Sequence, residues 1–215
     1  MNCLVCRSKE TTSINDTAEN KIYHHCPQCD FHFLSPEFRL NESEEKARYL
    51  HHENDVSNLH YQKFVQALVT SIQKKMSPDS IGLDYGCGPG PVATHLLKES
   101  GFKNIHLYDP FFQKNELFLN HQYDFIFCSE VAEHFFDPFS EFQRLRSLLK
   151  PQGILFIYSL FFDSSNESTS FIDWYYRRDA THVSFYSPKT MSFIAHRFNF
   201  SAIEIAPPRL AFMTA

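Results

Sequence analysis

The stretch Leu83–Pro91, LDYGCGPGP, links an apolar run to an amphipathic one and decides the fold. In it Asp84 is followed by three alternating glycines, Gly86, Gly88 and Gly90. Glycine is needed where a chain turns tightly and where a ligand approaches backbone N–H groups, because a Cβ would block both. Asp109 follows 25 residues after Asp84, at the end of the next predicted strand, where ribose hydroxyls are usually held. The combination predicts a nucleoside-binding strand–loop–helix unit.

Short apolar runs alternate with amphipathic patterns along most of the chain. The apolar runs predict strands at 81–86, 104–109, 123–129, 153–162, 201–208 and 210–214, with 116–120 as a further candidate. Helical spacing of apolar residues predicts helices at 57–76, where Ser57 is the expected N-cap, and at 91–101, 138–151 and 187–198. This alternation is typical of a doubly wound α/β sheet with crossover helices.

Composition and charge restrict the classes of partner. The chain has 215 residues, 43% of them hydrophobic and 21% charged, which suits one full domain with a small appendage. A net charge of −5 without a dense Lys/Arg block argues against nucleic acid as a partner. No apolar run approaches the roughly 20 residues of a membrane span, and the amino terminus lacks a signal-peptide pattern. We expect a cytoplasmic protein that does not associate with a membrane.

Four cysteines near the amino terminus are spaced as metal ligands. Cys3 and Cys6 form one C-x2-C pair, and Cys26 and Cys29 form a second pair after 19 intervening residues. Cytoplasmic thiols stay reduced, so the four thiolates predict a tetrahedral zinc site with a folding role, in a zinc ribbon over residues 1–35. Iron is an alternative that the sequence leaves open. Three nearby histidines are expected at the surface: His24, His25 and His32.

Further motifs follow the glycine-rich loop in a recognisable order. They are E-V-x-E-H from Glu130, D-P at Asp137 and L-L-K-P-x-G ending at Gly153. Together with that loop they resemble the class I S-adenosylmethionine (SAM)-dependent methyltransferases over residues 57–206. The resemblance implies a Rossmann-like sheet whose last strand is antiparallel, with a zinc ribbon (1–35), a linker (36–56) and a methyltransferase domain (57–215). A similar subgroup carries such a ribbon ahead of this domain.

The resemblance also implies which residues bind SAM. The three glycines would line its methionine part beside Cys87, Asp84 would anchor the loop or the amino group, and Asp109 would accept hydrogen bonds from the ribose next to Pro110. Ser129 and Glu130 would lie beside the transferred methyl group. One departure is the segment between Asp109 and Tyr123, which has 13 residues where the family fits a helix, a strand and a loop. Phe111 or Phe112 would then replace the missing adenine wall by stacking.

The segment Cys128–Phe136, CSEVAEHFF, supplies candidates for catalysis. His182 lies in the loop before the last predicted helix, and in similar proteins a histidine of this loop returns to the active site. In one interpretation Glu130, Glu133, His134 and His182 bind Mg²⁺, which resembles the metal sites of small-RNA 2′-O-methyltransferases and ubiquinone-pathway O-methyltransferases. In a second, His134 or His182 is a general base that Glu133 orients. In a third, these residues merely begin a helix and cap a loop.

The sequence therefore predicts a SAM-dependent methyltransferase that modifies oxygen or carbon of a small-molecule or glycan-like acceptor. The residues Trp174–Tyr176 form a candidate lid, and Arg177 and Arg178 either bind an anionic substrate or lie on a solvated loop. The alternative is a binding or scaffold protein whose ribbon docks a protein partner and whose cofactor pocket is impaired by the short segment.

Overall fold

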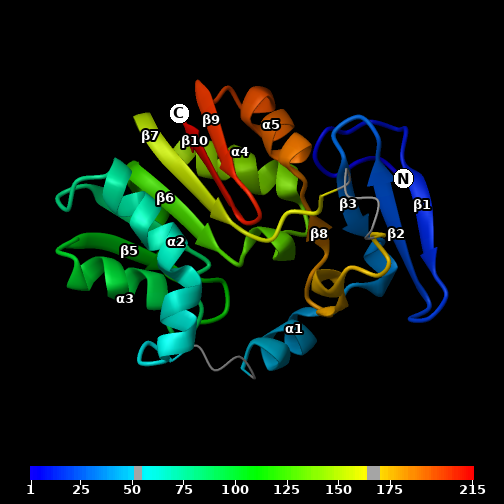
Figure 1. The fold of residues 1–215 in the computed structure, drawn as a ribbon, viewed down its shortest axis with the longest axis horizontal. Helices are drawn as coiled ribbons and strands as arrows, with labels where there is room; N and C mark the ends of the chain where they lie inside the picture. Colours follow the sequence, from blue (N-terminus) through cyan, green and yellow to red (C-terminus); the bar gives the residue numbers. More distant parts are fainter. Residues whose placement is uncertain (51–54, 164–169) are drawn as a thin grey trace.

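The computed structural model describes residues 1–50, 55–163 and 170–215; linker residues 51–54 lie outside it. A large six-stranded sheet flanked by helices adjoins a small four-stranded sheet that begins near the amino terminus (Figure 1). None of the helices in the described ranges has the length and apolarity that a membrane crossing requires.

Six strands make the large sheet: β4 (Ile81–Tyr85), β5 (Asn104–Tyr108), β6 (Tyr123–Ser129), β7 (Leu149–Tyr158), β9 (Ala202–Ala206) and β10 (Leu210–Thr214). They lie in the order β5-β4-β6-β7-β10-β9. The neighbours among β4 to β7 are parallel, whereas β10 runs antiparallel to both β7 and β9. The predicted α/β fold with an antiparallel last strand is confirmed.

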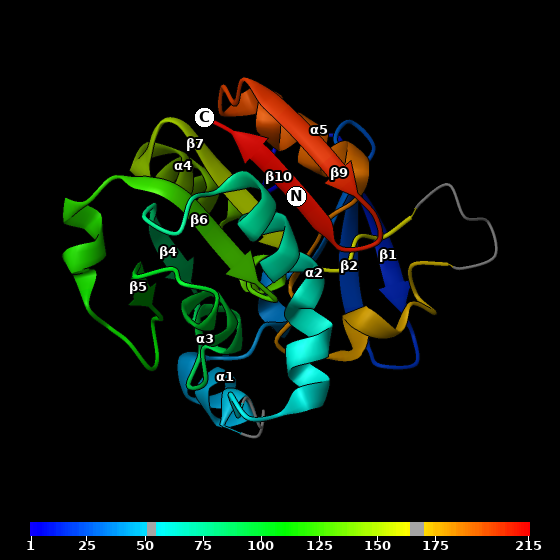
Figure 2. The ribbon, with the colours of Figure 1, turned by 60° about the vertical axis from the view of Figure 1, so that its left-hand side comes forward.

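Four helices cover the two faces of this sheet (Figure 2): α2 (Leu59–Lys75), α3 (Val92–Glu99), α4 (Pro138–Leu148) and α5 (Pro188–Arg197). Phe125 and Phe127 of β6 pack with α2 and α3, whereas Ile126 and Cys128 pack with α4 and α5. Successive side chains of a strand point to opposite faces, so β6 contributes to both cores. The predicted N-cap of α2 is wrong by one residue, because the Asn58 side chain caps the first turn.

The connection from β5 to β6 differs from the prediction. Residues 116–120 form a 3-10 helix, η2 (Glu116–Asn120), rather than a strand, and the Asn115 side chain caps it. Within the described residues β5 is therefore an edge strand of the sheet. The strand predicted at 153–162 instead spans 149–158, because Leu149 already pairs with Tyr123 of β6.

The small sheet joins the amino-terminal residues to a late segment of the chain. Its strands are β1 (Thr12–Asp16), β2 (Lys21–Cys26), β3 (Phe31–Leu34) and β8 (Ser184–Phe185). His32 and Phe33 of β3 pair with β8, which lies just before α5. The ring of Phe31 packs 5.2 Å from that of Tyr186, inside a core shared with the large sheet. The small sheet therefore packs directly on the large domain.

The remaining short elements are η1 (Pro36–Phe38), α1 (Glu42–Tyr49), η3 (Ala132–His134) and η4 (Tyr175–Arg178). The surface prediction for the ribbon histidines is wrong for two of them, since His24 is 8% and His32 5% exposed. His32 stacks on Phe171 at 4.5 Å, so aromatic packing from a distant segment buries it. His25 is half-buried and lies 3.0 Å from an Asp30 carboxylate oxygen.

Candidate active site

A cavity of about 760 Å³ lies at the carboxyl ends of β4, β5 and β6. Residues that follow each of these strands line it, and α1 and α2 supply further wall residues. Ligands of open α/β folds bind at this edge, and the volume suits a small-molecule ligand. All nine predicted cofactor residues line this cavity: Asp84, Gly86, Cys87, Gly88, Gly90, Asp109, Pro110, Ser129 and Glu130.

The glycine-rich loop needs glycine for two physical reasons. Gly86 has φ +85° and Gly88 has φ +62°, a region that other residues rarely adopt. A Cβ on Gly86 would also lie 2.5 Å from a methyl carbon of Val131. The Gly86 and Cys87 N–H groups donate to the carbonyl of Tyr108, which ties the loop to the end of β5.

Asp84 and Asp109 lie on either side of the loop and make different hydrogen bonds. Asp84 is buried and accepts a hydrogen bond of 2.7 Å from the Thr94 hydroxyl, and burial raises its pKa to about 7. Asp109 accepts from the N–H groups of Phe111, Phe112 and Gly88, at 2.8, 3.0 and 2.9 Å. Each carboxylate oxygen has two lone pairs, so Asp109 retains acceptor capacity for a ligand hydroxyl.

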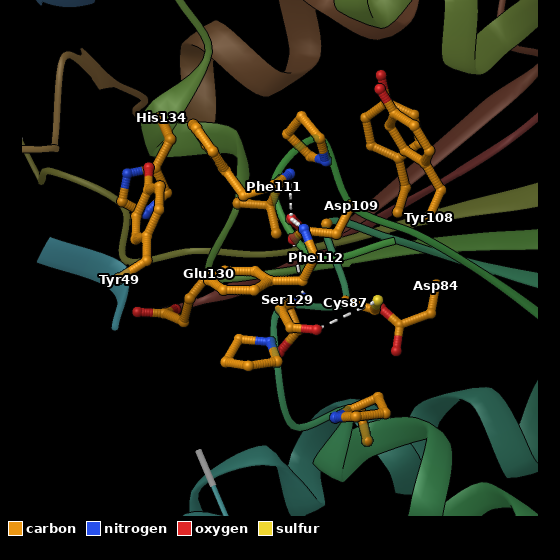
Figure 3. A pocket seen from close by; sticks show the side chains of 18 of the residues that line it. Tyr49, Asp84, Cys87, Tyr108, Asp109, Phe111, Phe112, Ser129, Glu130 and His134 are labelled. Carbon is orange, nitrogen blue, oxygen red and sulfur yellow. Dashed lines mark hydrogen bonds between the residues drawn. The ribbon is translucent and has the colours of Figure 1, made fainter. Parts of the chain in front are cut away.

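Figure 3 shows how the lining residues of the cavity are arranged around Asp109. Tyr49 and His134 lie together on one side of it, and Tyr108 lies on the other. Ser129, beneath them at the end of β6, has a buried hydroxyl oxygen with no hydrogen-bond partner among the described residues. An unpaired buried polar atom in a cavity is costly unless a ligand or water satisfies it.

Glu130 is held by Arg209 and Tyr176. Its φ of +54° is unusual for a residue other than glycine, and its Oε1 accepts a 2.9 Å hydrogen bond from Arg209. Its Oε2 accepts from the Tyr176 hydroxyl at 3.1 Å. Burial, followed by the nearby Glu133, raises the pKa of Glu130 to about 8.

Glu133, His134 and His182 converge, with one potential ligand atom from each lying within 4.8 Å of the others. Glu133 is fully buried; its Oε1 accepts a 2.5 Å hydrogen bond from Tyr176, and its Oε2 has no hydrogen-bond partner among the described residues. His134 donates from Nδ1 to the Thr181 carbonyl and His182 donates from Nδ1 to the Tyr176 carbonyl. His134 therefore keeps its Nε2 lone pair for a proton or a cation.

The pKa of His134 makes the stability of the fold dependent on pH. Burial lowers this pKa to about 4, below the value of about 6.5 in an unfolded chain. Between these values the unfolded state binds more protons, so the contribution of His134 is complete above about pH 6.5 and is lost as the pH falls toward 4. Between pH 7.5 and pH 4 we expect the free energy of unfolding of wild type to fall by about 3 kcal/mol more than that of His134→Gln, which lacks the imidazole. Urea unfolding of wild type and His134→Gln from pH 4 to 7.5 measures the free energy of unfolding. Parallel curves of this free energy against pH for the two proteins would contradict the prediction.

The contacts of several site residues could not be predicted from motifs, including those of Tyr176, which the sequence predicts only as part of a lid. Tyr176 and Arg209 bond to the two glutamates, and Tyr49, from the predicted linker, packs its ring 5.3 Å from that of His134. Tyrosine and arginine in loops carry no specific sequence signal. The interpretation of Arg177 as a solvated or substrate-binding residue is wrong, because its side chain is 5% exposed and lies 2.7 Å from Asp16.

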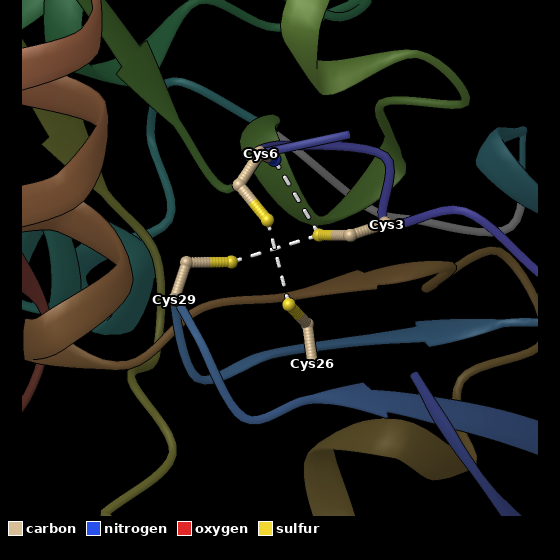
Figure 4. Close-up of side chains that lie close together, drawn as sticks. All are labelled: Cys3, Cys6, Cys26 and Cys29. Atoms are coloured by element: carbon tan, nitrogen blue, oxygen red, sulfur yellow. Dashed lines mark hydrogen bonds between the residues drawn. The ribbon is translucent and has the colours of Figure 1, made fainter. Parts of the chain in front are cut away.

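The four ribbon cysteines point their sulfur atoms toward one centre (Figure 4). The Sγ atoms of Cys3 and Cys29 are 3.6 Å apart, and those of Cys6 and Cys26 are 3.4 Å apart. A tetrahedral zinc ion with bonds of about 2.3 Å spaces its sulfur ligands by about 3.8 Å. The donor set and the spacing fit zinc, and four thiolates leave no position for a substrate.

Removal of this site is expected to destabilise more than the ribbon. Because the cysteines share a core with the large sheet, we expect Cys29→Ser to lower the melting temperature by more than about 10 °C. Elemental analysis should find one zinc per wild-type chain and less in the variant. The control is Cys128→Ser, another fully buried cysteine, which should keep its zinc. Equal zinc content and melting temperature for wild type and Cys29→Ser would refute the assignment.

The motif order and the cavity point to one family, and comparison with known proteins decides it. The sequence model of a family described as a methyltransferase domain matches residues 57–205, more than half of the chain. This chain belongs to that methyltransferase family. Among curated proteins, the ubiquinone biosynthesis O-methyltransferase of Histophilus somni is 38% identical over 79 residues, which are 35% of this chain. They are only 33% of that protein, so the chain spans about a third of this relative's length.

Solved structures agree on the fold of this methyltransferase-family chain. Human N-acetylserotonin methyltransferase in complex with SAM has a TM-score of 0.55 at 12% identity, covering 81% of this chain and 56% of that one. The 1,6-didemethyltoxoflavin-N1-methyltransferase of Burkholderia thailandensis, with bound S-adenosylhomocysteine (SAH), has a TM-score of 0.51 at 15% identity. It covers 96% of this chain and 98% of that one. The chain thus has the α/β methyltransferase fold.

Proposed function

We propose that this protein transfers the methyl group of SAM to an oxygen atom of a small-molecule or glycan-like acceptor. The observation that carries the proposal is one shared cavity. The glycine-rich loop, Asp109, His134 and His182 all line it. SAM bound at the glycine-rich loop and an acceptor hydroxyl near the two imidazoles would therefore meet in the same cavity. The O-methyltransferase name of the H. somni relative supports oxygen as the methylated atom.

The cofactor would occupy the glycine-rich end of the cavity. The backbone of Gly86, Cys87, Gly88 and Gly90 would hold its methionine part above Asp84, and Asp109 beside Pro110 would accept hydrogen bonds from its ribose. The unpaired Ser129 hydroxyl and Glu130 would lie next to the methyl group. Phe111 and Phe112 line the same end and would stack on adenine in place of the wall that the short 110–122 segment omits.

The acceptor hydroxyl would lie at the Glu133–His134–His182 cluster and attack the methyl carbon in line with the departing sulfur. The new O–C bond forms as the C–S bond breaks, SAH leaves with the electron pair, and the hydroxyl proton passes to an imidazole Nε2. His134 suits this role because its Nδ1–H is held by the Thr181 carbonyl and its lowered pKa keeps it neutral at pH 7. The Glu133 charge would stabilise the imidazolium that results.

A divalent cation at the same cluster is a second candidate, favoured by the buried, unpartnered Oε2 of Glu133. One carboxylate and two imidazoles suit Mn²⁺, Fe²⁺ or Zn²⁺ better than Mg²⁺, which prefers oxygen ligands. Glu130, the fourth predicted ligand, bonds to Arg209 instead. When bound, such an ion would hold the acceptor oxygen and lower the pKa of its hydroxyl.

A scaffold protein that binds a partner through its ribbon is the rival function. It is favoured by the short connection between β5 and β6, where η2 replaces the helix and strand expected there. The intact loop geometry and Asp109 hydrogen bonds support the enzyme instead.

Transfer of a radioactive methyl group from SAM tests the proposal. Phenols, catechols, sugars and an RNA oligonucleotide serve as acceptors, each with EDTA and with added Mn²⁺ or Mg²⁺. We expect label in a hydroxyl-bearing small molecule, and none in RNA, because the chain carries a net charge of −5. Activity that survives EDTA supports the imidazole base, and activity restored by Mn²⁺ supports the cation. Label in RNA alone, or in no acceptor, contradicts the proposal.

A further inference from the structure

A buried ion pair connects the small sheet to the loop that carries part of the catalytic cluster. Nη1 of Arg177 lies 2.7 Å from Oδ2 of Asp16, the last residue of β1, and the two side chains are 5% and 1% exposed. The guanidinium also lies over the ring of Tyr23 in β2. Arg177 is thus enclosed by residues of the amino-terminal strands, 154 or more positions away in the sequence.

The residues that follow and precede Arg177 make the contacts that shape the catalytic cluster. Tyr176 donates its hydroxyl proton to Glu133 and accepts the Nδ1–H of His182 on its carbonyl. The Thr181 carbonyl accepts the Nδ1–H of His134. The loop 176–182 therefore fixes the tautomer of both imidazoles and one oxygen of the buried carboxylate.

Residues just before Arg177 also define the position of this loop. Nε of Arg177 donates to the Ile172 carbonyl at 2.6 Å, which closes the turn that contains η4. Trp174 in the same turn is buried against Phe162 and Phe185. A buried ion pair adds little net stability compared with apolar packing, but any displacement of Arg177 from Asp16 would leave two buried charges uncompensated. The Asp16 carboxylate thus selects where the Arg177 backbone, and Tyr176 with it, can lie.

We propose that Asp16 and Arg177 are positioning residues that make the amino-terminal ribbon a structural part of the methyl-transfer site. The proposal rests on the function proposed above, since it concerns the same cluster. The ion pair acts through Tyr176 and Thr181, and neither Asp16 nor Arg177 touches the acceptor or the cofactor. The ribbon would then control catalysis without contributing a ligand or a base.

Four variants test the proposal: Arg177→Met, Arg177→Lys, Asp16→Asn and, as control, Arg178→Met. Arg177→Met removes the charge, and Asp16→Asn keeps an oxygen for the turn N–H groups of Ala18 and Glu19 that Oδ1 binds. Arg178 is the adjacent arginine but is exposed, so its replacement controls for loss of one positive charge in the same loop. Each variant is measured for kcat, KM for the acceptor, SAH affinity, melting temperature and fluorescence.

We expect Arg177→Met and Asp16→Asn to lower kcat about 10- to 100-fold while SAH affinity stays unchanged. Arg177→Lys should recover much of kcat, and Arg178→Met should match wild type. A merely structural role would lower the melting temperature without separating kcat from SAH affinity or distinguishing Lys from Met. Wild-type kcat in Arg177→Met, or equal losses of kcat in the Arg177→Met and Arg178→Met proteins, overturns the proposal.

The fluorescence of Trp174, the single tryptophan of the chain, separates this proposal from the proposed function. Its emission should shift to the red and become easier to quench with acrylamide in Arg177→Met and Asp16→Asn, but not in Arg178→Met. If wild type methylates no acceptor, the proposed function fails, while the emission still decides whether the ion pair fixes the loop. Unchanged emission in both ion-pair variants shows that it does not.

Discussion

Replacing Glu133 with glutamine is expected to lower kcat about 100- to 1000-fold and to leave SAH affinity unchanged. Glutamine has nearly the same shape, so the packing of this fully buried side chain should survive. The negative charge is lost, however. No carboxylate then offsets the positive charge of an imidazolium or a cation at this position. Single-turnover methyl transfer with saturating SAM, together with SAH titration of the same preparation, measures the two quantities.

The Tyr176→Phe and Glu133→Gln/His134→Gln variants make this prediction specific. Tyr176→Phe removes the hydrogen bond to Glu133 but keeps the carboxylate, so we expect a smaller loss, about tenfold. The double variant should lose little more than the worse single variant, because residues that act as one unit are not additive. Wild-type kcat in Glu133→Gln, or fully additive losses, would show that the cluster is not the proton acceptor.

Replacing Asp109 with alanine is expected to weaken SAH binding by about 1.5 to 3 kcal/mol, or roughly 10- to 150-fold. The carboxylate would accept the ribose hydroxyls, and it already orders the glycine-rich loop through the N–H groups of Gly88, Phe111 and Phe112. Alanine removes both effects at once. Calorimetric titration with SAH measures the loss.

Two further variants separate the ribose contact from a general effect of charge. Asp109→Asn keeps one acceptor oxygen and should bind SAH with intermediate affinity. Asp124→Asn changes a carboxylate that binds Lys150 and the Ile81 N–H at the start of β6, away from the cavity, and should bind SAH like wild type. Equal affinities for Asp109→Ala and Asp124→Asn would contradict the ribose role.

The large sheet could be predicted because each of its strands is a short apolar run followed by a turn or helix signal. β6 is the clearest example, since YDFIFCS buries alternate side chains in two different cores. Residues 116–120 could not be assigned in this way, because ELFLN is too short to separate a strand from a turn of helix. The pairing of β3 with the two-residue β8 joins segments about 150 positions apart, and no local pattern encodes it.

The same limit applies to the site. The glycine-rich loop, Asp109 and the E-V-x-E-H motif occupy short stretches with fixed spacing, so they could be named from sequence and they do meet at one cavity. Arg209 and Tyr176 reach Glu130 of that cavity only because β10 lies next to β7 and because the ribbon supports loop 176–182. Their contributions depend on tertiary packing, which residue type and spacing do not reveal.

Calorimetric titration of the purified protein with SAH tests the central claim most directly. The account predicts micromolar binding, one site per chain and a rise in melting temperature with SAH concentration, despite the short connection between β5 and β6. Absence of both binding heat and thermal stabilisation at millimolar SAH would contradict it, and would favour the scaffold function of the ribbon.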